Sequence, residues 1–170
     1  MKSSVYKYVW VLLLLFIFGC TKEEGSFRTS EFETPKISGY YCRTDRAILK
    51  DIVGVPNVIL EKKSLPYSLI VFPNPAENSC IINLRPFSDG INKKIWITSA
   101  EFEKPIPENA ITLGMNNIRV GGMPVYQNEF TAEAIRINIS SFEEGYYRVY
   151  LKFEDELFYD NLVVSKNSQS

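Results

Sequence analysis

The alternation of apolar and polar residues near the end of the chain is the feature that most constrains its fold. Residues 135–140 read Ile-Arg-Ile-Asn-Ile-Ser, and residues 147–153 read Tyr-Arg-Val-Tyr-Leu-Lys-Phe, so apolar side chains recur at every second position. A period of two places successive side chains on opposite faces of a β-strand, and each segment therefore predicts a strand with one buried face. No stretch shows a sustained helical period. The chain is predicted to be all-β.

Shorter apolar runs between turn residues predict the other strands. The Gly39–Cys42 and Ala47–Val53 segments are expected to form a hairpin across residues 43–46. The remaining predicted strands are residues 69–72, 80–84, 94–98 and 157–164. Many short strands with turns at this spacing predict an antiparallel β-sandwich. Residues 101–130 are interrupted by Pro and Gly, and we expect loops and short strands there.

The first nineteen residues have the parts of a secretory signal peptide. Lys2 and Lys7 are followed by an unbroken apolar run over residues 9–18, which is shorter than the roughly 20 residues that a membrane-spanning helix needs. The Ile17-Phe18-Gly19-Cys20 sequence resembles a lipobox, the motif of bacterial lipoproteins. This resemblance implies cleavage before Cys20 and lipidation of its thiol. The alternative is an ordinary signal peptide with an incidental cysteine.

A lipid on Cys20 would anchor the protein to a membrane, because two or more acyl chains hold a protein stably. Lys22, Glu23 and Glu24 follow the cysteine and resemble the export signal of surface lipoproteins in bacteria with type IX secretion. The alternative is that they form a solvated, charged tether. We expect an outer-membrane location. The predicted organisation is a signal peptide (1–19), a lipidated tether (20–36), a hairpin-like segment (37–65), a β-sandwich (66–166) and a tail (167–170).

Composition restricts the classes of function. The chain has no histidine, which excludes His-dependent catalytic triads and makes a zinc site improbable. Cleavage after residue 19 would leave 17 basic and 20 acidic residues, a balance without the basic surface that nucleic-acid binding requires. No nucleophile elbow and no phosphate-binding loop is present. We expect a protein that is not an enzyme and has no cofactor or metal.

Two cysteines would remain in the mature domain, Cys42 and Cys80. In an oxidising envelope an even pair is a disulfide candidate. Both also lie in apolar strand contexts, where a free cysteine is a small buried residue. The sequence leaves both interpretations open.

Acidic and aromatic residues are the other candidates for a binding site. The acids Glu143, Glu144, Glu154–Glu156 and Asp160 lack the spacing of a calcium loop, and we interpret them as solvated. The aromatic candidates for an exposed platform that binds a glycan or peptide are Trp96, Tyr126, Tyr146 and Tyr150. The alternative is that these rings pack in the core.

Three patches resemble a known family. The Val71-Phe72-Pro73-Asn74-Pro75-Ala76 sequence is similar to the opening motif of the type A C-terminal sorting domains of type IX secretion. Residues 137–149, with Gly145 and Tyr146 at the start of a strand, are similar to a later motif of that family, and residues 162–166 resemble its last strand. The resemblance implies an Ig-like β-sandwich that the secretion machinery recognises. It departs from the family in the long insertion at residues 99–130. The partners left open are an envelope protein, the secretion machinery and a glycan.

Overall fold

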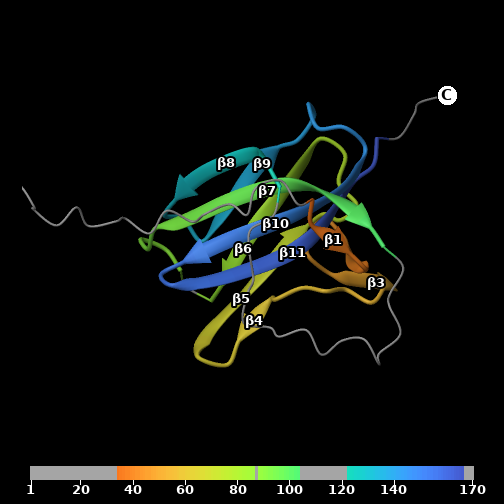
Figure 1. Ribbon diagram of the computed structural model, residues 1–170. Coiled ribbons are helices and arrows are strands. Elements are labelled where there is room, and N and C mark those ends of the chain that lie inside the picture. The colour runs from red at the N-terminus through yellow and green to blue at the C-terminus, as the bar shows by residue number, and fades with distance from the viewer. Residues whose placement is uncertain (1–33, 87, 104–121, 167–170) are drawn as a thin grey trace, which may run out of the picture.

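A computed structural model describes residues 34–86, 88–103 and 122–166, and within these ranges every regular element is a β-strand (Figure 1). The strands are β1 (Lys36–Ile37), β2 (Gly39–Arg43), β3 (Leu49–Gly54), β4 (Glu61–Lys62), β5 (Leu65–Phe72), β6 (Ser79–Arg85), β7 (Lys93–Phe102), β8 (Pro124–Phe130), β9 (Ala134–Asn138), β10 (Gly145–Phe153) and β11 (Glu156–Val164). The all-β prediction is confirmed. The described part of the chain holds no helix that is long and apolar enough to cross a membrane.

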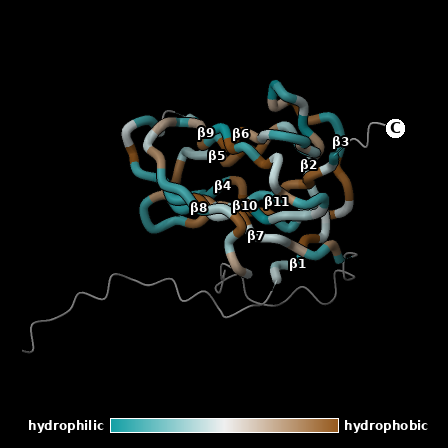
Figure 2. Tube along the Cα trace, turned by 90° about the horizontal axis from the view of Figure 1, so that it is seen from above, coloured by the Kyte–Doolittle hydropathy of each residue, from teal (hydrophilic) through white to brown (hydrophobic). Residues whose placement is uncertain are grey.

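The strands form two larger sheets and a separate hairpin. Sheet A has the order β1-β7-β10-β11, with β8 also paired to β7, and sheet B has the order β4-β5-β6-β9. Figure 2 shows β5, β6 and β9 in one layer, with β7, β8, β10 and β11 in the other. All pairings are antiparallel except the short parallel contact of β1 with β7. This arrangement is consistent with a β-sandwich.

The core lies between the two sheets and follows the predicted alternation. In β6 the core residues are Cys80, Ile82 and Leu84, and in β10 they are Tyr147, Val149, Leu151 and Phe153. Burial of each large aliphatic side chain contributes about 1.5–3 kcal/mol, so this interface is the main source of stability. The predicted face of residues 135–139 is also confirmed, with Ile137 and Ile139 buried and Ile135 packed against the core.

The N-terminal part of the described chain is built into the same body. The predicted hairpin is confirmed as β2 and β3, paired from Gly39↔Gly54 to Arg43↔Leu49. Lys36, the last residue of the predicted tether, lies in β1 and pairs with Glu101 of β7. β4 extends sheet B, and an isolated bridge joins Ile59 to Tyr159 of sheet A.

A buried lysine at the start of β7 is hydrogen-bonded to the neighbouring loops. Lys93 is completely buried, and its Nζ donates hydrogen bonds to the backbone carbonyls of Ser88, Ile91 and Thr131. The same Nζ lies 5.4 Å from the ring centroid of Phe130. Burial lowers the pKa of Lys93. Three carbonyl oxygens and one ring replace the water around this ammonium group, which explains how a cation can be accommodated there.

Candidate functional site

The Pro73-Asn74-Pro75-Ala76 motif lies between β5 and β6 and is centred on a buried asparagine. Asn74 is 1% exposed, and its Nδ2 donates to the carbonyls of Tyr41 and Asn161, both at 2.9 Å. Its Oδ1 accepts a hydrogen bond from Val163 N at 2.9 Å. The backbone of Asn74 also pairs with Arg43 of β2 in both directions. One side chain therefore ties the motif to β2 and β11.

The three patches that carry the family resemblance meet at the end of β11. Ala76 forms a parallel bridge with Val164, accepting from Ser165 N and donating to the Val163 carbonyl. In sheet A, Gly145 is opposite Val164 and Tyr146 is opposite Val163. These residues are far apart in sequence, and the structure brings them together around the last two residues of one strand. We call this cluster the motif junction.

Beside the motif junction, Arg43 and Asp160 form a buried ion pair. Arg43 Nη1 lies 2.7 Å from Asp160 Oδ2, and it also donates to the Val71 carbonyl at 3.1 Å. The other carboxylate oxygen, Oδ1, accepts from Asn161 N at 2.8 Å. Burial raises the pKa of Asp160, while the Arg43 guanidinium opposes that shift. The prediction that Asp160 is solvated is therefore wrong, because β2 covers it.

A second polar cluster lies on the opposite face of sheet A. Arg148 Nε donates to Asn161 Oδ1 at 3.1 Å, and Nη2 donates to Asn57 Oδ1 at 2.9 Å and to the Lys36 carbonyl at 3.0 Å. The guanidinium also lies 4.8 Å from the ring centroid of Tyr159. Burial lowers the pKa of Arg148. These contacts hold the segment before β4 against sheet A, and the sequence analysis identified none of them.

The two cysteines do not form the disulfide that the sequence left open. Cys42 is half-buried in β2 opposite Asp51, whereas Cys80 is buried in β6 opposite Ile137. Both thiols are free, with Cys42 in the separate hairpin and Cys80 in the core of sheet B. Burial raises the pKa of Cys80 to about 12. Cys80 is thus a packing residue.

The lipidation candidate Cys20 and the export-signal candidates Lys22, Glu23 and Glu24 lie outside the described residues. So do residues 167–170 of the predicted tail. These predictions rest on the sequence alone.

The other acidic candidates do not converge. Glu143, Glu144, Glu154 and Asp155 are exposed in turns, and Glu156 pairs with Lys62 at 2.8 Å. In the described ranges no group of three or more His, Cys, Asp or Glu residues is placed to hold a metal ion.

The four aromatic candidates do not form an exposed row. Trp96 is 7% exposed and Tyr150 is 1% exposed, and both pack with Leu157 and Tyr159 on the outer face of sheet A. Tyr126 packs against the central core instead. Tyr146 is half-buried and contacts the rings of Tyr40 and Phe102. An aromatic platform made of these rings is therefore contradicted, because packing within the domain occupies them.

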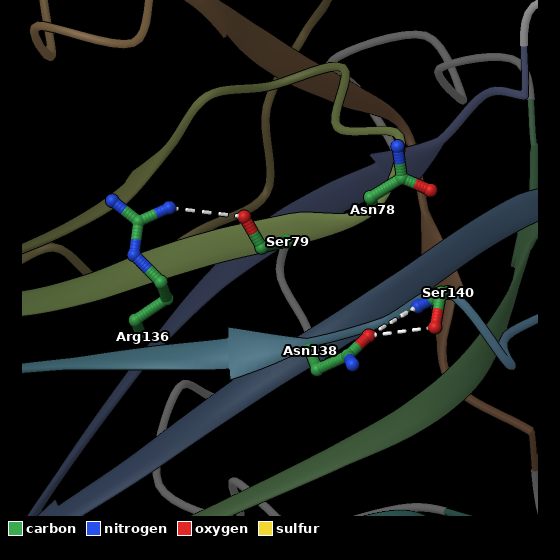
Figure 3. A pocket seen from close by; sticks show the side chains of 5 residues that line it. All are labelled: Asn78, Ser79, Arg136, Asn138 and Ser140. Atoms are coloured by element: carbon green, nitrogen blue, oxygen red, sulfur yellow. Dashed lines mark hydrogen bonds between the residues drawn. The ribbon is translucent and has the colours of Figure 1, made fainter.

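A polar hollow lies on the outer face of sheet B in the described part of the chain. It has a volume of about 460 Å³ and is lined by Asn78, Ser79, Arg136, Asn138 and Ser140 (Figure 3). Ser79 pairs directly with Asn138 across β6 and β9, and Ile81 pairs with Arg136, so the polar side chains share the face opposite to the core. Arg136 Nη1 donates to Ser79 Oγ at 3.1 Å. The sequence analysis did not identify this site, because its residues come from two segments that are distant in sequence and that only the pairing of β6 with β9 brings together.

No protein-family model matches the chain, and a search of curated proteins finds no match.

Proposed function

We propose that this chain is a lipid-anchored protein of the bacterial outer membrane, displayed at the cell surface, with a non-enzymatic binding or structural role. The observation that carries the proposal is the lipobox-like sequence ending at Cys20, directly after an apolar run too short to span a bilayer. The first described strand, β1, begins at Lys36, and the charged residues after Cys20 lie between these two positions in the sequence. Anchoring through acyl chains needs no spanning segment in the rest of the chain.

Metabolic labelling with a fatty-acid analogue and protease shaving of intact cells test this proposal together. The wild-type chain should take up the label and be cleaved from outside, and Cys20→Ala should lose the label. A variant with Lys22, Glu23 and Glu24 changed to alanine should keep the label but become protected from protease. An unlabelled wild-type chain would overturn lipidation. A labelled chain that is protected from protease in the wild type would place it inside the envelope.

A second candidate function is recognition by the type IX secretion machinery, with an Ig-like sandwich as the recognised module. The motif junction favours it, because all three patches of the sorting-domain resemblance lie around Val163 and Val164. A single recognition element made of these residues would therefore depend on a folded β11.

A reporter fusion tests this second function. Because β1 belongs to sheet A and β2 is bonded to Asp160 of β11 and to Asn74, the fused segment should start at residue 34 and end at residue 170. Export of a soluble reporter to the medium of a type IX host supports recognition. Retention of the fusion in the periplasm contradicts it, provided that the fused domain is folded.

A further inference from the structure

We propose that the polar hollow between β6 and β9 binds a saccharide that carries a carboxylate, such as a chain of uronic acid units, with Arg136 holding the carboxylate. The inference gives a ligand class to the binding role proposed above and rests on that role being one of binding. It uses residues that neither the lipid anchor nor the motif junction involves.

The charge of the hollow is set by Arg136. Its side chain is exposed, and within the described residues its guanidinium makes one hydrogen bond, from Nη1 to Ser79 Oγ at 3.1 Å. Nε and Nη2 are therefore available to a ligand. A guanidinium presents its N–H groups in a fixed fork that matches the two oxygens of a carboxylate. The lining contains no Asp or Glu that would compete for this cation.

Asn138 faces the hollow with a fixed side chain. Its Oδ1 accepts two hydrogen bonds from Ser140, one from the backbone N at 2.9 Å and one from Oγ at 2.7 Å. Figure 3 shows both bonds on the same oxygen of Asn138. The amide is thus oriented before any ligand arrives, which reduces the entropy cost of binding.

The remaining lining residues supply neutral polar groups. The Asn78 side chain has no hydrogen bond to the described part of the chain, and the hydroxyls of Ser79 and Ser140 each retain acceptor capacity. A set of amides and hydroxyls around one cation matches a ligand with several hydroxyl groups and one negative charge. A uronic acid unit has this composition. A dianionic phosphate would leave one charge unbalanced.

The hollow has the size that such a ligand requires. Its volume of about 460 Å³ falls in the range of roughly 300–1,000 Å³ that is typical of small-ligand sites. It lies across β6 and β9, and β9 is the edge strand of sheet B within the described residues.

Binding of trigalacturonate to the full-length protein in detergent micelles tests the inference, with its methyl-esterified form and inorganic phosphate as comparison ligands. Calorimetry gives the affinities, and side-chain amide NMR signals of Asn78 and Asn138 report the place of binding. We expect the acid to bind at least about tenfold more tightly than the ester, which corresponds to 1.4 kcal/mol. Arg136→Gln should weaken binding of the acid by at least about tenfold, whereas Arg46→Gln, on the distant hairpin, should not change it.

Asn138→Asp provides a second variant with the same shape and an added negative charge, and it should weaken binding of the acid more than that of the ester. All three substitutions are at exposed positions, and circular dichroism checks that the fold is retained. Equal binding of acid and ester, unchanged binding by Arg136→Gln, tighter binding of phosphate than of the uronate, or no binding would each overturn the inference. Lipidation and surface display are measured separately, so such a result would leave the proposed anchor intact.

Discussion

The Arg43 guanidinium and the Asp160 carboxylate form an ion pair of 2.7 Å whose side chains are 7% and 0% exposed. Arg43 ends β2 and Asp160 lies in β11, so the pair joins the separate hairpin to the last strand of sheet A. Removal of one partner of a buried pair leaves the other charge without compensation, which is far more costly than loss of a surface pair. The pair therefore makes the hairpin part of the cooperative unit.

Arg43→Ala should lower the free energy of unfolding by about 3–5 kcal/mol, because it leaves the Asp160 carboxylate buried and unpaired. Urea denaturation followed by circular dichroism at pH 7 measures the change. Arg46→Ala, three residues further along in the exposed turn, is the matched control and should change stability by less than about 0.5 kcal/mol. Equal losses in the two variants would show that the ion pair does not link the hairpin to sheet A.

Asn74→Ala should destabilise the domain by at least about 2 kcal/mol, because it removes both donors and the acceptor that join the motif to Tyr41, Asn161 and Val163. Native-state hydrogen exchange should also become faster at the Val163 amide. Asn74→Asp retains the acceptor for Val163 and loses the two donors. Its stability therefore separates the contribution of the donors from that of the acceptor. Asn92→Ala, at an exposed position, is the control, and protection of Val163 that is equal in all variants would refute the assignment.

Gly39→Ala should be more destabilising than Gly90→Ala. A Cβ at Gly39 would clash with the Val53 carbonyl and lie 2.6 Å from Val55 N, and both obstacles are backbone atoms of the paired strand region. We expect a loss of about 3 kcal/mol or more from this overpacking. Gly90 has φ of +78° but open space around it, so alanine there should cost about 1–2 kcal/mol from backbone strain alone. Thermal unfolding of both variants shows which substitution is the more destabilising.

Cys80 should make the stability of the domain depend on pH in the alkaline range. Its pKa is about 12 in the folded protein, against 9.0 for a thiol in water, because burial disfavours the thiolate. The unfolded chain releases this proton first, so stability falls as pH rises through the interval between the two values. At pH 10 the loss should be about 1.4 kcal/mol relative to neutral pH. Cys80→Val should lack this part of the decline, and identical pH profiles of the two proteins would contradict the assignment.

The alternation of apolar residues predicted the strands and their core-facing side chains, but it cannot show what covers the other face. In β10 it correctly placed Tyr147 and Val149 in the core, yet Arg148 and Tyr150 on the opposite face are also buried. Asn57 contacts Arg148 and Tyr159 contacts Tyr150, and no local sequence pattern predicts these contacts. Asp160 was misassigned for a different reason: it lies opposite Val149 on the core-facing side of sheet A, where Arg43 from the distant β2 pairs with it.

The sequence did not predict the polar hollow for another reason. Asn78 and Ser79 follow the proline-rich motif, whereas Arg136, Asn138 and Ser140 lie in a segment that was interpreted through its isoleucines and its similarity to a sorting-domain motif. Their polar side chains were taken as the solvated half of an alternating strand. Only the register that places Ser79 opposite Asn138 shows that the two sets share one surface.

β11 has a consequence for biogenesis. It contacts β10 along its whole length, and it also supplies partners to Arg43, Ile59, Asn74 and Ala76, although it is the last strand of the described residues to be synthesised. Contacts between segments distant in sequence form slowly and require both segments to be present. We therefore expect a polypeptide that emerges N-terminus first from a ribosome or a translocation channel to complete its fold only after residues 156–164 are released. Premature termination before this strand would leave a protease-sensitive chain instead of a smaller domain.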